Sequence, residues 1–97
     1  MQIEKTLEKI GFSQNEIKVY LASLVLGSSK VNEIAKKASL FRTTTYEILK
    51  DLVVKGLVSY IFKSGVKYFE AADPTKLVHI LEEKKNKLKE ILPELKS

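Results

Sequence analysis

Apolar residues recur at helical spacing through the first part of the chain. A short helix is predicted over residues 2–10, and Gly11 ends it. A second helix is predicted from Ser13 to Gly27, because Ser13 and Glu16 have the spacing of a capping box, in which each side chain bonds the backbone amide of the other residue. In the first helix, Ile3, Leu7 and Ile10 are expected to share one face. In the second, the expected buried stripe consists of Ile17, Leu21, Leu24 and Val25.

Two more helices, separated by a tight turn, are predicted over residues 32–38 and 42–55. A very short strand is expected before them, at Lys30 and Val31, and Gly56 suits the end of the second helix. Small alanine side chains in the first of these helices allow a close helix crossing. The residues expected on the inner faces are Ile34, Ala35, Ala38, Thr45, Ile48, Leu49, Leu52 and Val53.

A β-hairpin follows, since residues 57–62 and 66–71 are rich in β-branched and aromatic residues and the loop 63–65 contains glycine. Both strands carry apolar residues on both faces, so the pattern leaves the register open. Asp73 and Pro74 then have the order of an N-cap and a first helical residue.

The last helix is predicted to run from Pro74 to the end of the chain and to carry a coiled-coil seam with one charged interruption. A lone terminal helix could not keep such a seam exposed to water, so we expect it to form a homodimer, with its first apolar residues packing on the same chain. The alternative is a helix that folds wholly onto its own domain. The predicted dimer interface consists of Leu77, Leu81, Lys84, Leu88, Ile91 and Leu95.

The order of these elements is that of a winged helix-turn-helix, a mainly α fold with a small β-hairpin. The 97 residues fit one folding unit. Residues 1–73 are predicted to form a DNA-binding domain, and residues 74–97 a dimerisation helix.

Charge and composition narrow the class of function. The net charge of +5 and the pI near 9.4 favour a polyanionic partner, chiefly nucleic acid. The chain has no cysteine, no apolar run long enough to span a membrane and no visible secretory signal, so a cytoplasmic protein without disulfides is expected. His79 is interpreted as a structural or solvated histidine, and Glu82 and Glu83 as part of a solvated helix face. No phosphate loop, nucleophile–base pair or metal-ligand cluster indicates an enzyme, a cofactor or a metal.

The beginning of the fourth helix carries the candidate chemistry. In a helix-turn-helix the second helix enters the major groove, and its first residues contact base edges. Arginine suits guanine, and threonine offers a hydroxyl and a methyl group. Tyr46 lies at the edge of the core stripe, where packing is favoured over DNA contact. The candidate contacts with double-stranded DNA are Arg42, Thr43, Thr44, Tyr46, Lys50, Ser29, Lys30, Asn32, Lys63, Ser64, Gly65 and Lys67.

A second class of function fits the same fold, namely a winged helix used as a protein-interaction module. Such modules often lose the basic first turn and the basic wing, which this sequence keeps at Arg42, Lys63 and Lys67. Binding to duplex DNA that weakens with salt would separate the two classes.

The stretches 31–49 and 51–58 resemble the winged helix of the TrmB family of transcription regulators. Residues 7–13 and 16–21, the Asp73–Pro74 pair and residues 91–95 match that family as well. The resemblance implies a homodimer on palindromic promoter DNA.

Two features depart from the family pattern. Longer members carry a C-terminal sugar-binding domain, whereas this chain ends at Ser97, so no small-molecule ligand domain is expected in it. Phe41 stands where a small polar residue or proline is usual, and we expect it to alter the capping of the recognition helix.

Overall fold

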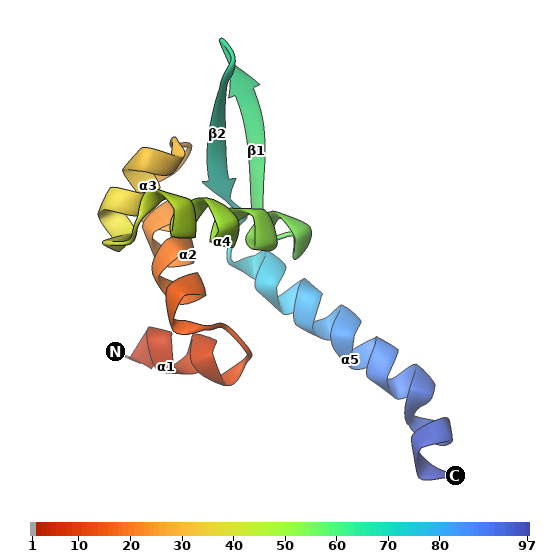
Figure 1. The fold of residues 1–97 in the computed structure, drawn as a ribbon. Coiled ribbons are helices and arrows are strands. Elements are labelled where there is room, and N and C mark those ends of the chain that lie inside the picture. The colour runs from red at the N-terminus through yellow and green to blue at the C-terminus, as the bar shows by residue number, and fades with distance from the viewer. Residues whose placement is uncertain (1) are drawn as a thin grey trace.

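The computed structural model describes residues 2–97, and Met1, the first residue of the predicted DNA-binding domain, lies outside them. The elements follow the predicted order of helices and hairpin and form a winged helix with one extra helix (Figure 1). They are α1 (Gln2–Lys9), α2 (Gln14–Leu26), α3 (Val31–Ala38), α4 (Arg42–Val54), β1 (Val58–Lys63), β2 (Val66–Ala71) and α5 (Thr75–Lys96).

The predicted capping box begins α2. The Glu16 amide donates a hydrogen bond to Ser13 Oγ at 3.1 Å, and the Ser13 amide donates to Glu16 Oε1 at 2.9 Å. The second carboxylate oxygen of Glu16 accepts a bond of 2.6 Å from Lys55 Nζ. Glu16 therefore joins the beginning of α2 to the residue that follows α4.

The predicted buried stripe of α2 is wrong in part. Ile17 is buried, but Val25 is 71% exposed, whereas Val19 and Tyr20 are fully buried. The reason is the central position of α2, which contacts α1, α3, α4 and β2. A helix that is covered on several sides buries more than the single face that its most apolar residues suggest.

The helix-turn-helix consists of α3, a tight turn and α4. Ser39 adopts a left-handed backbone conformation, with φ of 58°, and its amide bonds the last carbonyls of α3. The predicted inner faces are confirmed, since every residue proposed for them is buried or half-buried. Within α4, Leu49 and Leu52 are fully buried against the rest of the core.

The wing is a two-stranded antiparallel hairpin in which Val58 pairs with Ala71 and Lys63 with Val66. The predicted three-residue loop is one residue too long, because Lys63 is part of β1. Ser64 and Gly65 form the turn with φ of 51° and 77°, the two positive angles that a type I′ hairpin turn requires.

A backbone bridge ties the wing to the loop before α3. The amide of Ser29 donates to the Phe69 carbonyl at 2.9 Å, and the amide of Phe69 donates to the Ser29 carbonyl at 2.8 Å. The short strand predicted at Lys30 and Val31 is therefore found at Ser29, and Val31 already belongs to α3.

The last helix, α5, extends away from the other elements (Figure 1). Asp73 Oδ1 accepts bonds from the Thr75 amide and hydroxyl at 2.8 and 2.6 Å; these bonds lower the pKa of Asp73 and confirm its capping role. The radius of gyration is 15.4 Å, against about 13 Å for a compact domain of this size. Within the described part of the chain, α5 therefore leaves most of its surface uncovered.

The contact between Glu16 and Lys55 leads to a prediction about stability and pH. Partial burial alone would raise the pKa of Glu16, but the hydrogen bond and charge of Lys55 and the Ser13 amide outweigh burial and hold this pKa below its ordinary value. Because the folded-state pKa is depressed, the stabilisation is present at neutral pH and is lost as the pH falls through it.

We expect Glu16→Gln, which can still cap α2, to lower the free energy of unfolding by about 0.5–1 kcal/mol at pH 7. At pH 3 the difference from the wild type should largely vanish. Urea unfolding of the wild type and the variant at both pH values measures this difference in the free energy of unfolding. An equal loss of stability at pH 7 and pH 3 would contradict the ionic contribution.

Candidate nucleic-acid interface

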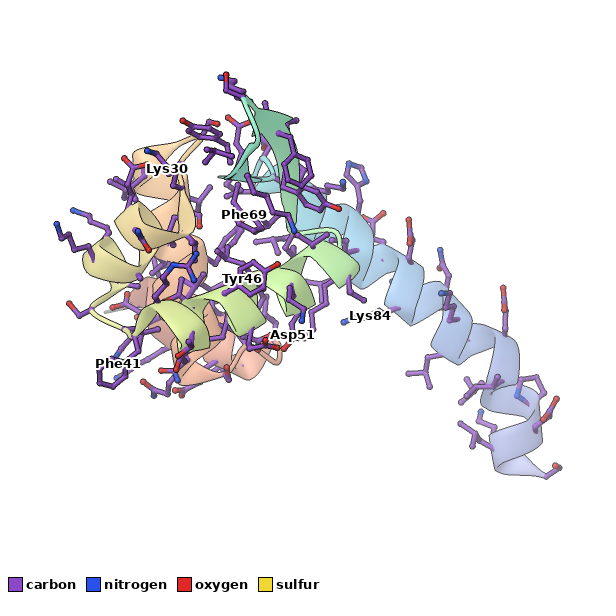
Figure 2. The ribbon with its side chains drawn as sticks, turned by 45° about the horizontal axis from the view of Figure 1, so that its top comes forward. Lys30, Phe41, Tyr46, Asp51, Phe69 and Lys84 are labelled. Atoms are coloured by element: carbon purple, nitrogen blue, oxygen red, sulfur yellow. The ribbon has the colours of Figure 1, made fainter. Side chains whose placement is uncertain are left out.

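The beginnings of α3 and α4 and the inner face of the wing surround a hollow of about 430 Å³, which we call the α3–α4–wing hollow. Figure 2 labels three of the residues that line it, Lys30, Tyr46 and Phe69. Three of the lining residues, Lys30, Arg42 and Lys67, are cationic and none is acidic. The residues that line it are Lys30, Val31, Asn32, Arg42, Tyr46, Gly65, Val66, Lys67 and Phe69. The fold thus brings together basic residues from three separate parts of the predicted site.

The first turn of α4 lies at the edge of this hollow. Arg42 and Thr43 are exposed, and Thr44 is half-buried. Thr45 points inward, and its hydroxyl donates to the Phe41 carbonyl at 2.9 Å. No acidic residue lies in this first turn, so no side chain there offsets the positive end of the helix dipole. The turn is suited to approach an anionic partner.

Phe41 occupies the N-cap position of α4. Its side chain makes no capping hydrogen bond, and it is 83% exposed. The expected effect on capping is confirmed, because α4 begins without the side-chain acceptor that Ser, Thr, Asp or Asn would supply. Figure 2 shows Phe41 directed away from the body of the protein.

An aromatic cluster lies between the wing and α4. Tyr46 is half-buried and meets the buried ring of Phe69 edge-on, with 6.3 Å between ring centroids, as its predicted packing requires. Lys67 Nζ lies 4.0 Å from the centroid of Tyr60 and within 6 Å of those of Tyr46, Phe62 and Phe69. Lys67 is therefore held by cation–π contacts.

Sequence reasoning missed this cluster. The signal was the alternation of aromatic residues at positions 60 and 62 opposite Lys67 and Phe69. In the register found here, Tyr60 pairs with Phe69 and Phe62 with Lys67, which brings the rings around the lysine.

The remaining candidate residues differ in exposure and in the face of the protein on which they lie. Lys50 is exposed and pairs with Glu47 at 3.5 Å, and Lys63 lies over Tyr68 on the opposite face of the wing. Ser29 is 2% exposed, and its hydroxyl donates to the Gly27 carbonyl at 2.7 Å. We therefore remove Ser29 from the candidate contacts, because it lies beneath the surface. The other candidate positions remain Asn32, at the start of α3, and Ser64 and Gly65, at the tip of the wing.

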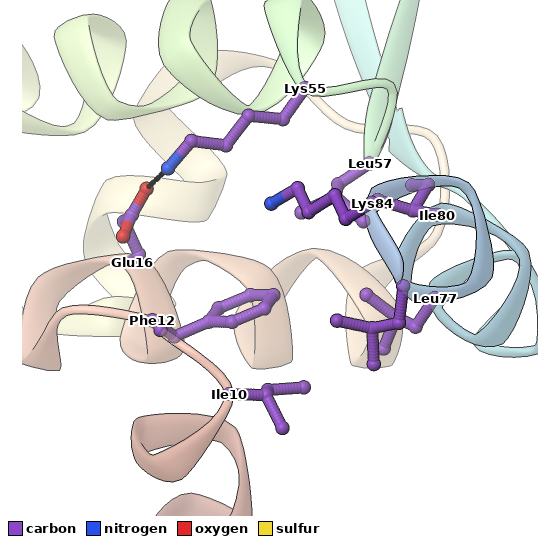
Figure 3. Close-up of a pocket in the computed structure, with 10 residues that line it drawn as sticks. Ile10, Phe12, Glu16, Lys55, Leu57, Leu77, Ile80 and Lys84 are labelled. Atoms are coloured by element: carbon purple, nitrogen blue, oxygen red, sulfur yellow. Dashed lines mark hydrogen bonds and ion pairs between the residues drawn. The ribbon is translucent and has the colours of Figure 1, made fainter. Parts of the chain in front are cut away.

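A second, apolar cavity of about 100 Å³ lies where the beginning of α5 meets the body of the protein (Figure 3). Leu77 and Ile80 pack against the core there, and Figure 3 shows Lys84 reaching over the cavity on the side of Glu16 and Lys55. The cavity is lined by Ile10, Gly11, Phe12, Glu16, Lys55, Leu57, Leu77, Ile80, Leu81 and Lys84. Half of the predicted dimer interface, Leu77, Leu81 and Lys84, thus faces its own chain.

Across residues 2–97, no group of three His, Cys, Asp or Glu side chains could hold a metal ion. None of the helices in that range combines the length and the apolar composition needed to cross a bilayer.

Comparison with known proteins identifies the family. The model of the family described as "Sugar-specific transcriptional regulator TrmB" matches residues 7–75. The chain belongs to the TrmB family. The matched range contains the whole hollow and the wing.

The TrmB-family chain is similar to the sugar-sensing transcriptional regulator TrmBL1 of Pyrococcus furiosus, with 33% identity over 60 residues that cover 62% of this chain and 18% of the relative. The fold of this chain matches that of TrmBL2, an archaeal chromatin protein, with a TM-score of 0.82 at 23% identity. The match covers 97% of this chain and 36% of TrmBL2. The chain thus spans less than a fifth of TrmBL1 and about a third of TrmBL2.

Other solved structures share the fold of this TrmB-family chain. A possible transcriptional regulator of Methanosarcina mazei matches with a TM-score of 0.71 at 15% identity, over 99% of this chain and 88% of the other. A MarR family regulator of Silicibacter pomeroyi matches with a TM-score of 0.64 at 18% identity, over 98% and 58%. The family description is that of a transcriptional regulator, and the solved structures show that the winged-helix fold is shared.

Proposed function

We propose that this TrmB-family chain binds double-stranded DNA in a sequence-specific manner and regulates transcription as a homodimer. The observation that carries the proposal is the α3–α4–wing hollow, where Lys30, Arg42 and Lys67 converge without an acidic neighbour among the lining residues. Basic residues gathered on one face are the electrostatic signature of a nucleic-acid interface.

The first turn of α4 has the position and the chemistry for base contact. Arg42 and Thr43 are exposed beside the hollow, on a helix that the buried residues Leu49 and Leu52 fix to the core. With α4 in the major groove, Arg42 would meet a guanine edge and Thr43 a neighbouring base, and the wing would lie against the adjacent backbone. The helix-turn-helix regulator TrmBL1 and the DNA-binding chromatin protein TrmBL2 support DNA as the partner.

The proposed homodimer rests on the outer part of α5. Beyond Lys84, the seam residues Leu88, Ile91 and Leu95 are all exposed, and Leu92 lies next to them. An isolated helix is only marginally stable in water, so this apolar stripe favours pairing with a second copy. We narrow the proposed interface to these outer residues, because the inner ones line the cavity of their own chain.

Selection of bound duplexes from a random DNA library tests the function. We expect enrichment of an inverted repeat with half-site centres about 34 Å apart, or a multiple of that distance, and binding that weakens steeply with salt. If the selection enriches no sequence and the protein shows no salt-dependent binding to duplex DNA, the DNA-binding function is contradicted.

The alternative function is a protein-interaction module. The exposed apolar side chain of Phe41 favours it, and a negative result in the DNA selection would support it.

We expect Arg42→Ala to weaken binding to the selected site by about 1–3 kcal/mol and to relax the base preference at one position of each half-site. The reason is that alanine cannot make the bidentate hydrogen bonds with guanine. A fluorescence titration against site variants measures both effects. Lys9→Ala, which removes an equal charge from α1, is the control and should leave the base preference unchanged. Unchanged preference in Arg42→Ala would remove this residue from the base-contacting set.

The charges of the wing are expected to contact phosphate rather than bases. Replacing Lys63 and Lys67 with methionine keeps much of each side chain while removing its charge. Binding should weaken for all sequences alike, and the slope of log K against log salt should fall by about 0.9 for each phosphate that the wing no longer neutralises. An altered sequence preference at an unchanged slope would contradict this role.

The double variant Leu88→Asp, Ile91→Asp places two charges in the proposed seam and should be monomeric, with loss of tight binding to the inverted repeat. The control Asn86→Asp, Lys89→Asp changes the other side of α5 and should remain dimeric. Sedimentation equilibrium measures the oligomeric state of each variant. A wild-type protein that is monomeric at micromolar concentration, with and without DNA, would contradict the homodimer.

A further inference from the structure

We propose that Phe62, supported by Tyr60, is a specificity-determining residue that makes apolar contact in the minor groove of DNA. The inference rests on the proposed DNA-binding function and adds to it, because the candidate contacts on the wing were so far only cations and the residues of its tip. It assigns the aromatic rings and the charges of the wing to different parts of the duplex.

The register of the hairpin places these residues on the face of the wing that borders the hollow. Tyr60 pairs with Phe69 and Phe62 with Lys67, so the four side chains share one face. Phe69 and Lys67 line the α3–α4–wing hollow. Phe62 is 64% exposed, and Tyr60 is partly exposed. An aromatic row therefore runs from the core toward the tip of the wing.

The exposed ring is held in place by its neighbours. Phe69 is fully buried, Tyr60 packs on it with 6.0 Å between centroids, and Phe62 meets Tyr60 edge-on at 5.9 Å. Lys67 Nζ adds its cation–π contact with Tyr60. This chain of contacts from the core presents Phe62 as a fixed apolar projection, which needs little further ordering on binding.

The neighbouring charges indicate which partner this projection meets. A protein partner with an apolar patch would have to cover the Lys67 ammonium, whereas DNA supplies phosphates for it beside the apolar faces of the sugars. Proteins that bind the minor groove often insert phenylalanine or other apolar side chains next to such cations. The guanine amino group is the feature that distinguishes base pairs in this groove, so an apolar ring there selects against it.

A pair of neighbouring substitutions tests the proposal with the full chain and the selected duplex. We expect Phe62→Ser to weaken binding about tenfold, with the salt slope unchanged because the charge of the wing stays the same. Ile61→Ser is the matched control, since Ile61 is 53% exposed on the same strand but points to the opposite face. It should change the affinity less than twofold. Circular dichroism confirms that both variants are folded.

A second measurement uses the wild type and does not depend on how a variant folds. At the positions that flank the α4 contacts, an inosine·cytosine pair and a guanine·cytosine pair differ only by the minor-groove amino group. We expect the guanine pair to bind the wild type several-fold more weakly at one flanking position, and Phe62→Ser to lose most of that difference.

The outcomes separate the inference from the function on which it rests. A wild type that binds no duplex would contradict the proposed function itself. A wild type that binds but is insensitive to the amino group at every flanking position would overturn the role of Phe62 alone. Equal affinities of Phe62→Ser and Ile61→Ser for the selected duplex would also overturn the role of Phe62 alone.

Discussion

The position of the wing relative to α4 depends on the buried ring of Phe69. Its backbone makes both hydrogen bonds with Ser29, which fix β2 to the loop before α3. Its ring contacts Tyr46 of α4 and Tyr60 of β1. One residue thus links the three parts of the chain that border the hollow. Since a two-stranded hairpin is marginally stable alone, the wing relies on this anchor.

The anchor lets charged and apolar groups act together at the surface. Lys30 and Arg42 come from the beginnings of α3 and α4, and their distance from Lys67 is set by the way Phe69 holds the wing. Lys67 would otherwise be a flexible surface lysine, but the rings around it restrict its ammonium to the side of the hollow. Basic residues placed in advance lose less conformational freedom on meeting a polyanion than free side chains do.

Local signals explain why most of the fold could be predicted from the sequence. The capping box of Ser13 and Glu16, and the N-cap of Asp73, act over two or three residues and are found as expected. The apolar period of α4 predicted its buried face because the side of that helix with Glu47, Lys50 and Val54 is exposed. Burial in α2 could not be predicted in the same way, since Val19 and Tyr20 are buried by elements distant in the sequence.

The site was harder to predict than the fold because it depends on register. Apolar residues on both faces of the two strands left either face free to point inward, and only the positive φ angles of Ser64 and Gly65 fix the two-residue turn. The aromatic cluster around Lys67 follows from that register. Ser29 is buried where the loop before α3 bridges to Phe69, a contact between segments distant in the sequence. Arg42 and Thr43 were predictable, since their exposure depends only on their place at the start of α4.

Amide chemical-shift changes in the ¹⁵N-labelled protein, titrated with the selected duplex, test most directly whether the α3–α4–wing hollow is the DNA interface. We expect the largest changes at Lys30, at Arg42 and Thr43, and along β1 and β2. The amides of α1 should change little. Changes confined to α1 and α5, with none around the hollow, would contradict the assignment.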